Sequence, residues 1–211
     1  IKTSDGETLH AWWLPSSTTV TKGSILFLHG NAENISTHFA NAAWLPSAGY
    51  NVLALDYRGY GLSTGEPDLS GVLVDIEATF EYLVNKLNRE GLPVFILGQS
   101  IGGALSLSFV GNNALAQKKT RAMIIDAGFE SFQGIAREKL GELWLTWPLQ
   151  YPLSWLITDD HDPEQYLNTL PAIPKLFFHS KDDIVIPYHH GQRIFESSSE
   201  PKDFITTQGP H

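Results

Sequence analysis

Ser100 stands in the pattern Gly98-Gln99-Ser100-Ile101-Gly102, between the apolar run Val94 to Leu97 and the helix-like run Gly103 to Leu107. A serine between a strand and a helix sits on a tight turn that exposes its hydroxyl, and small neighbours allow close packing there. The helix N-terminus also favours negative charge that develops nearby. Small residues occur at such turns by chance too, so the flanking strand and helix carry the interpretation of Ser100 as a nucleophile.

A second loop that could take part in catalysis is His29-Gly30-Asn31-Ala32, which follows the apolar run Ile25 to Leu28. A nucleophilic serine of this kind needs a loop that supplies a second backbone N–H to an oxyanion hole. We expect the N–H groups of Asn31 and Ile101 to stabilise the anion of a tetrahedral intermediate, which makes the reaction an acyl transfer. The alternative is a simple turn, because glycine and asparagine tolerate unusual backbone angles.

Three runs together resemble the Bem46-like α/β hydrolases: residues 29–34 (HGNAEN), 56–63 (DYRGYGLS) and 98–103 (GQSIGG). The resemblance covers nearly the whole chain and is specific for fold and mechanism rather than for substrate. It implies an α/β-hydrolase fold and a serine esterase, thioesterase or lipase-like activity on a small or lipid-like acyl substrate. It also implies that Asp56 and Arg58 shape a loop near the active site without being catalytic.

The same resemblance indicates where the rest of a catalytic triad lies, because these hydrolases supply serine, acid and histidine in that order. The segment after Lys175 to His179 resembles the family's acid loop, in which an aspartate stands four residues before a proline, and this register selects Asp183 over Asp182. His211 follows Gln208-Gly209-Pro210, like the family's glycine-rich histidine loop. We expect Asp183 to orient His211 and His211 to act as the base. Because the chain stops at His211, we also expect this residue to be displaced or mobile, farther from Ser100 than a hydrogen bond. The other histidines, including His189 and His190 at the start of a surface helix, have structural explanations.

Elements that could position these residues alternate along the chain. Short apolar runs without apolar/polar alternation predict buried strands at residues 25–29, 51–56, 94–98, 122–126, 175–179 and 203–207. Between them, apolar residues spaced by three or four over Leu69 to Leu87 predict a helix. The alternation predicts an α/β domain with a mostly parallel sheet and helices on both faces.

The segment 129–170 interrupts this alternation and predicts a small helical cap insertion over the carboxyl ends of the strands. We expect its aromatic side chains to form an apolar wall for the substrate, namely Trp144, Trp147, Tyr151 and Trp155. Packing of the insertion onto the sheet is the alternative role, because aromatic clusters are more often core than pocket.

Composition excludes several classes of function. The net charge of −9 disfavours nucleic acid as a partner, and the absence of cysteine excludes disulfides and thiolate zinc sites. His161 and the neighbouring aspartates lack a spacing that would aim ligands at a metal, and no glycine-rich loop fits a dinucleotide or phosphate. We therefore expect no cofactor and no metal.

The 211 residues predict one domain over residues 1–211. The chain begins without methionine and stops inside the histidine motif, so we expect both ends to be truncated. The chain offers no spanning segment, which predicts a soluble domain, cytoplasmic or tethered to a membrane by a missing N-terminal segment. Two other functions remain open: a serine peptidase of the prolyl-oligopeptidase type, and a non-catalytic binding protein on the same scaffold.

Overall fold

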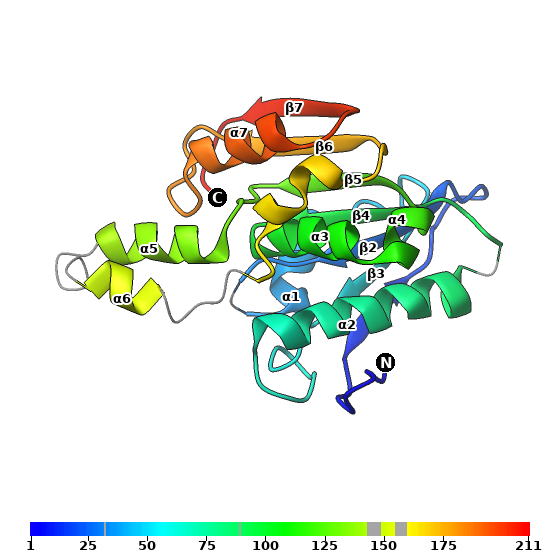
Figure 1. Cartoon of the computed structure of the whole chain (residues 1–211). Helices are drawn as coiled ribbons and strands as arrows, with labels where there is room; N and C mark the ends of the chain where they lie inside the picture. The colour runs from blue at the N-terminus through cyan, green and yellow to red at the C-terminus, as the bar shows by residue number, and fades with distance from the viewer. Residues whose placement is uncertain (32, 89, 143–148, 155–159) are drawn as a thin grey trace.

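The computed structural model describes residues 1–31, 33–88, 90–142, 149–154 and 160–211, and is built around a seven-stranded sheet (Figure 1). The strand order is β1-β3-β2-β4-β5-β6-β7, with β1 antiparallel to β3 and every other neighbouring pair parallel. The strands are β1 (Ala11–Leu14), β2 (Gly23–Leu28), β3 (Tyr50–Leu55), β4 (Val94–Gln99), β5 (Thr120–Asp126), β6 (Lys175–Ser180) and β7 (Lys202–Thr207).

The six strands expected from apolar runs are confirmed. Those runs do not alternate because both faces of the sheet are covered. In β2, Leu26 and Leu28 join the larger core cluster on one face, while Ile25 and Phe27 join a second cluster on the other. All four side chains are buried, so both orientations of the pleat must be apolar. The edge strand β1 was not among the six, because it has only four half-buried residues.

Helices cover both faces of this sheet, as expected (Figure 1). Asp68 begins α2 by accepting a hydrogen bond from the backbone N–H of Gly71 at 2.7 Å. The predicted helix over Leu69 to Leu87 is helical throughout, with its last turn widened into a π-helix. The helices are α1 (Ile35–His38), α2 (Leu69–Tyr82), α3 (Ile101–Asn112), α4 (Ala114–Lys119), α5 (Phe132–Glu142), α6 (Gln150–Ser154) and α7 (Tyr188–Ser197); short turns of other helix types are η1 (Phe39–Asn41), η2 (Leu83–Leu87), η4 (Pro163–Gln165) and η5 (Leu167–Thr169).

The carboxyl ends of the parallel strands lie at one edge of the sheet, so the loops that carry the candidate catalytic residues meet there. The described parts of 129–170 are mainly helical, and α5 and α6 project outward from this edge (Figure 1). Within the described part of the chain, none of the helices has the length and apolar character required to cross a membrane.

Candidate active site

Ser100 occupies a strained turn between β4 and α3. Its backbone has φ 55° and ψ −120°, a left-handed conformation that costs a non-glycine residue on the order of 1–3 kcal/mol. A Cβ at Gly98 would lie 2.3 Å from the carbonyl oxygen of Gly102, and one at Gly102 would lie 2.2 Å from that of Leu28. Only glycine therefore permits this close approach of strand and helix.

The loop after β2 passes beside this serine. A Cβ placed at Gly30 would lie 3.4 Å from Cβ of Ser100, so glycine brings the backbone against the nucleophile candidate. The loop is tied down by two tyrosine hydroxyls: Tyr60 donates to Oδ1 of Asn31 at 2.8 Å, and Tyr57 donates to the carbonyl of His29 at 3.0 Å.

The backbone N–H groups of Asn31 and Ile101 are available to a ligand. Neither group has a hydrogen-bond partner among the described residues, and both residues line the same cavity. Ile101 is the first residue of α3, and the first N–H groups of a helix lack intrahelical acceptors. The structure thus brings the two predicted donors to one place.

His29 supports this loop from inside the protein. Its ring is fully buried, lies 4.4 Å from the ring of Tyr57 and 5.3 Å from that of His38, and makes a 2.7 Å hydrogen bond from Nδ1 to the carbonyl of Gly30. Burial lowers the pKa of His29 to about 4, because desolvation disfavours the imidazolium. His29 is therefore a neutral structural residue at pH 7.

Asp56 and Arg58 hold the next loop, as the family resemblance implied. The carboxylate of Asp56 accepts a hydrogen bond from the N–H of Ile35 at 2.8 Å and lies 2.8 Å from Nδ1 of His10. Arg58 makes a buried ion pair with Asp75 at 2.8 Å. Both side chains therefore anchor loops rather than face Ser100.

Asp183 and His211 meet through a direct hydrogen bond. Nδ1 of His211 donates to Oδ2 of Asp183 at 2.7 Å, while Oδ1 of Asp183 accepts the N–H groups of Val185 and Ile186, each at 2.8 Å. Because Nδ1 carries the proton in this bond, Nε2 of a neutral His211 is an acceptor. Asp182 instead accepts from the N–H of Gly209 at 3.2 Å.

Among the described contacts, His211 is hydrogen-bonded to Asp183 and no hydrogen bond joins it to Ser100. The 2.7 Å contact with Asp183 places His211 in one defined position, which differs from the displaced or mobile end that we expected. Contacts between a base and its nucleophile often form only when a substrate is bound.

Two cavities flank the turn at Ser100. The Ile101 cavity, of about 380 Å³, has a mainly apolar wall from Tyr57, Leu69, Val72, Leu105, Phe129, Phe132 and Ile135. The His211 cavity, of about 580 Å³, has a mixed lining, in which polar residues (Asn41, Gln99, Asp126, Asp183 and His211) alternate with apolar ones (Trp44, Leu97, Ile124 and Phe178). Gln99 faces one cavity and Ile101 the other, so Ser100 lies between them.

Asp126 was not among the predicted site residues, although it ends β5 beside the elbow. Its carbonyl accepts the N–H of Ser100 at 2.7 Å, and its side chain lines the His211 cavity. Burial raises the pKa of the Asp126 carboxyl, and the nearby His211 and His179 only partly offset this. Its position at the end of a central strand is the signal that could have identified it.

Phe132 and Ile135 were also missed. They lie three residues apart on α5, and both line the Ile101 cavity, so the insertion does supply an apolar wall. Of the four aromatic residues predicted for that wall, Tyr151 is half exposed with its ring 5.0 Å from the guanidinium of Arg137. Trp144, Trp147 and Trp155 lie outside the described residues.

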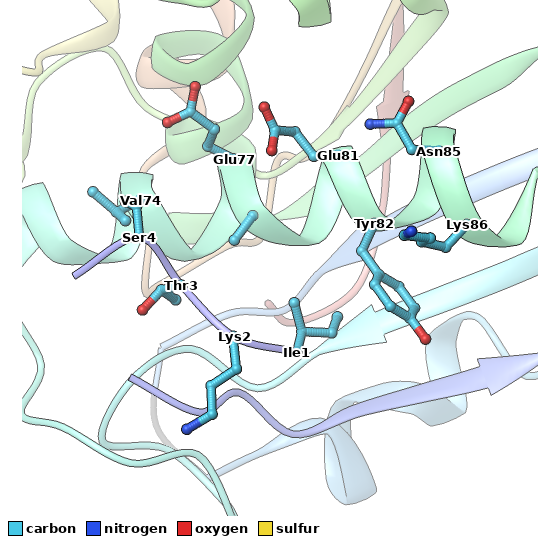
Figure 2. A pocket seen from close by; sticks show the side chains of 11 residues that line it. Ile1, Lys2, Thr3, Ser4, Val74, Glu77, Glu81, Tyr82, Asn85 and Lys86 are labelled. Atoms are coloured by element: carbon cyan, nitrogen blue, oxygen red, sulfur yellow. The ribbon is translucent and has the colours of Figure 1, made fainter. Parts of the chain in front are cut away.

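A further cavity, of about 560 Å³, lies between α2 and the first residues of the chain (Figure 2). Glu77, Glu81 and Lys86 line one side, and Ile1 and Lys2 line the other. None of the predicted site residues lines this cavity, and the charged side chains that Figure 2 shows along α2 and η2 are the exposed Glu77, Glu81 and Lys86.

Comparison with known proteins supports the assignment of these elements to one family. Residues 19–169 match the family model described as serine aminopeptidase, S33. The uncharacterised protein YfhR of Escherichia coli K12 is 33% identical over 205 residues, which cover 95% of this chain and 68% of YfhR. Protein bem46 of Schizosaccharomyces pombe is 27% identical over 194 residues, covering 89% of this chain and 60% of bem46.

Solved structures share the fold. The esterase Pf2001 of Pyrococcus furiosus superimposes with a TM-score of 0.78 at 19% identity, covering the whole of this chain and 82% of Pf2001. At this identity the likeness establishes the fold alone, namely that of the α/β hydrolases.

Proposed function

The chain belongs to the Bem46-like α/β hydrolases, and from this premise we propose that it is a serine esterase or thioesterase acting on a substrate with an apolar acyl group. The observation that carries the proposal is the hydrogen bond between Asp183 and His211 at the edge of a cavity that adjoins Ser100. This bond supports the proposal because it gives His211 the tautomer that a general base for Ser100 requires.

In the proposed reaction, Nε2 of His211 takes the proton of Ser100 as Oγ attacks the carbonyl carbon of the substrate. The N–H groups of Asn31 and Ile101 bind the resulting oxyanion. His211 then returns the proton to the leaving oxygen or sulfur, whose bond to carbon breaks, and an acyl-enzyme forms. Water, deprotonated by the same histidine, releases the acid and restores Ser100.

The two cavities then receive different parts of the substrate. The protonated His211 must reach the leaving atom, so the leaving group lies in the His211 cavity. The carbonyl oxygen points toward Asn31 and Ile101, and the acyl chain extends into the Ile101 cavity that these residues border. Contact with the apolar wall removes the acyl chain from water, which favours binding by roughly 25 cal/mol per Å² of apolar surface buried.

An aminopeptidase is the second candidate, because the matching family model carries that description. Such an enzyme must bind a free α-ammonium group beside the scissile carbonyl. In the Ile101 cavity the carboxylate is Asp68, which already caps α2 and lies 3.7 Å from Arg58. An apolar acyl group therefore fits this cavity better than a charged amino-acyl group.

The test compares p-nitrophenyl esters and thioesters with amino-acyl p-nitroanilides on the same preparation. We expect ester or thioester turnover that Ser100→Ala removes. Preferential cleavage of the anilides would favour the peptidase. The absence of turnover on every substrate, together with no labelling by a fluorophosphonate probe, would favour a non-catalytic binding protein.

A further inference from the structure

A cluster of metal-ligating side chains joins α5 to α7, away from Ser100. Glu138 comes from α5, and His189 and His190 begin α7. One atom of each side chain lies within 4.8 Å of the corresponding atoms of the other two. Sequence reasoning assigned the two histidines to a surface helix, and the glutamate is distant in the chain.

The distances suit a tetrahedral ion. Oε2 of Glu138 lies 3.0 Å from Nε2 of His190 and 3.5 Å from Nε2 of His189. Zinc binds nitrogen and oxygen ligands at about 2.0–2.2 Å, which places tetrahedral ligand atoms about 3.3 Å apart. An ion could therefore enter with small side-chain movements.

A second, independent observation is the outer partner of His190. Its Nδ1 donates to Oε2 of the largely buried Glu130 at 2.7 Å, and Glu130 is held in turn by Arg193 at 2.9 Å. Histidines that bind metals usually donate their other ring N–H to a carboxylate, which fixes the tautomer and directs the free nitrogen at the ion. The other ring nitrogen, Nε2, is hydrogen-bonded to Oε2 of Glu138 at 3.0 Å, and a bound Zn²⁺ would take the place of the proton between these two atoms.

The three candidate ligands differ in how far their side chains are buried. The side chain of His190 is 3% exposed, whereas those of His189 and Glu138 are 42% and 35% exposed. The inner ligand is thus fixed by packing, and the outer two leave a path for an ion from solvent. Two imidazoles with one carboxylate favour Zn²⁺ over Mg²⁺ or Ca²⁺, which prefer oxygen ligands alone.

We propose that Glu138, His189 and His190 bind a Zn²⁺ ion, with water as the fourth ligand, and that this ion holds the insertion against the helix that follows the Asp183 loop. The insertion also touches the loop that carries Asp183, where Nζ of Lys139 donates to the carbonyl of Ile184 at 3.0 Å. The ion therefore adds a link between α5, which lines the Ile101 cavity, and the loop that carries Asp183.

The competing explanation is an ion pair without metal, in which a protonated His190 bridges Glu130 and Glu138. That arrangement has no need of His189. His189→Ala therefore separates the two explanations, and the exposed side chain of His189 can be shortened without opening the core.

The experiment uses the untagged chain after dialysis against EDTA, titrated with ZnCl₂ by isothermal titration calorimetry and followed by thermal unfolding. We expect one Zn²⁺ per chain, a higher Tm with Zn²⁺ than with Mg²⁺, and affinity lowered at least about tenfold in His189→Ala and in Glu138→Gln. Glu130→Gln should weaken binding about tenfold through the outer contact. His161→Ala, at a histidine remote from the cluster, should bind like the wild type.

Wild-type affinity in His189→Ala, loss of binding in His161→Ala, or no stoichiometric binding would each overturn the proposal. Circular dichroism of His189→Ala without zinc verifies that the variant is folded.

Discussion

The Ile101 cavity and the His211 cavity lie on either side of Ser100 but are built by different means. The first is walled by apolar side chains and bordered by a loop that buried aromatic rings and tyrosine hydroxyls hold in place. The second is lined by apolar and polar side chains together, and it contains the hydrogen-bonded pair of Asp183 and His211. We infer that the Ile101 cavity selects the acyl group of the substrate and that proton transfer takes place in the His211 cavity.

The largest expected effect comes from removal of the Ser100 hydroxyl, which lies between the two cavities. Ser100→Ala should lower kcat by about a millionfold on esters, because a triad acts as a unit once its nucleophile is lost. A fluorophosphonate probe followed by peptide mass spectrometry should label Ser100 in the wild type and not in the variant. Undiminished labelling of the alanine variant would refute the assignment of Ser100.

The next effect is confined to the His211 cavity. Asp183→Asn should lower kcat by about ten-thousandfold, because an amide favours the wrong tautomer of His211. Asp182→Asn is the matched control, and its turnover should stay near that of the wild type, since among the described residues that carboxylate accepts from the N–H of Gly209 and not from His211. Steady-state kinetics on one p-nitrophenyl ester measure kcat for both variants. A larger loss in Asp182→Asn than in Asp183→Asn would show that Asp182 orients the histidine.

The loop on the Ile101 side should respond to acid through His29. Its folded pKa of about 4 lies below that of a free imidazole, about 6.5, so the unfolded chain takes up the proton first. The contribution of His29 to stability is therefore complete above pH 6.5 and is lost as the pH falls toward 4, by up to about 3 kcal/mol.

His29→Asn keeps a donor for the carbonyl of Gly30 but does not titrate in this range. Urea unfolding between pH 7 and pH 4 should show a smaller loss of stability in this variant than in the wild type. An NMR titration of the folded wild type gives a direct measurement, and a His29 midpoint near 6.5 would contradict the prediction.

The smallest expected effect concerns acyl-chain length. Ile135→Trp should narrow the Ile101 cavity and lower kcat/KM for p-nitrophenyl octanoate about tenfold relative to the acetate, since each methylene contributes about 1–3 kcal/mol of selectivity. Trp44→Ala opens the His211 cavity instead and should leave the ratio unchanged. Equal ratios in all three proteins would show that the acyl chain lies elsewhere.

The sequence alone determined the features whose physical cause is local. Apolar runs predicted six strands because β2 and its neighbours are buried on both faces. The small residues around Ser100 predicted the elbow because only glycine fits where a strand and a helix approach within contact distance. The family's acid-loop register selected Asp183, which the structure places on His211.

Tertiary structure decided what depends on segments that are distant in the chain. Phe132 and Ile135 line a cavity with Ile101 only because the start of α5 lies beside the start of α3, and nothing in the sequence of the insertion indicates this neighbour. Glu138 meets His189 and His190 only where α5 packs beside α7. Local spacing fixes the direction of a side chain within one element, whereas contacts between elements depend on how loops and burial place those elements against each other.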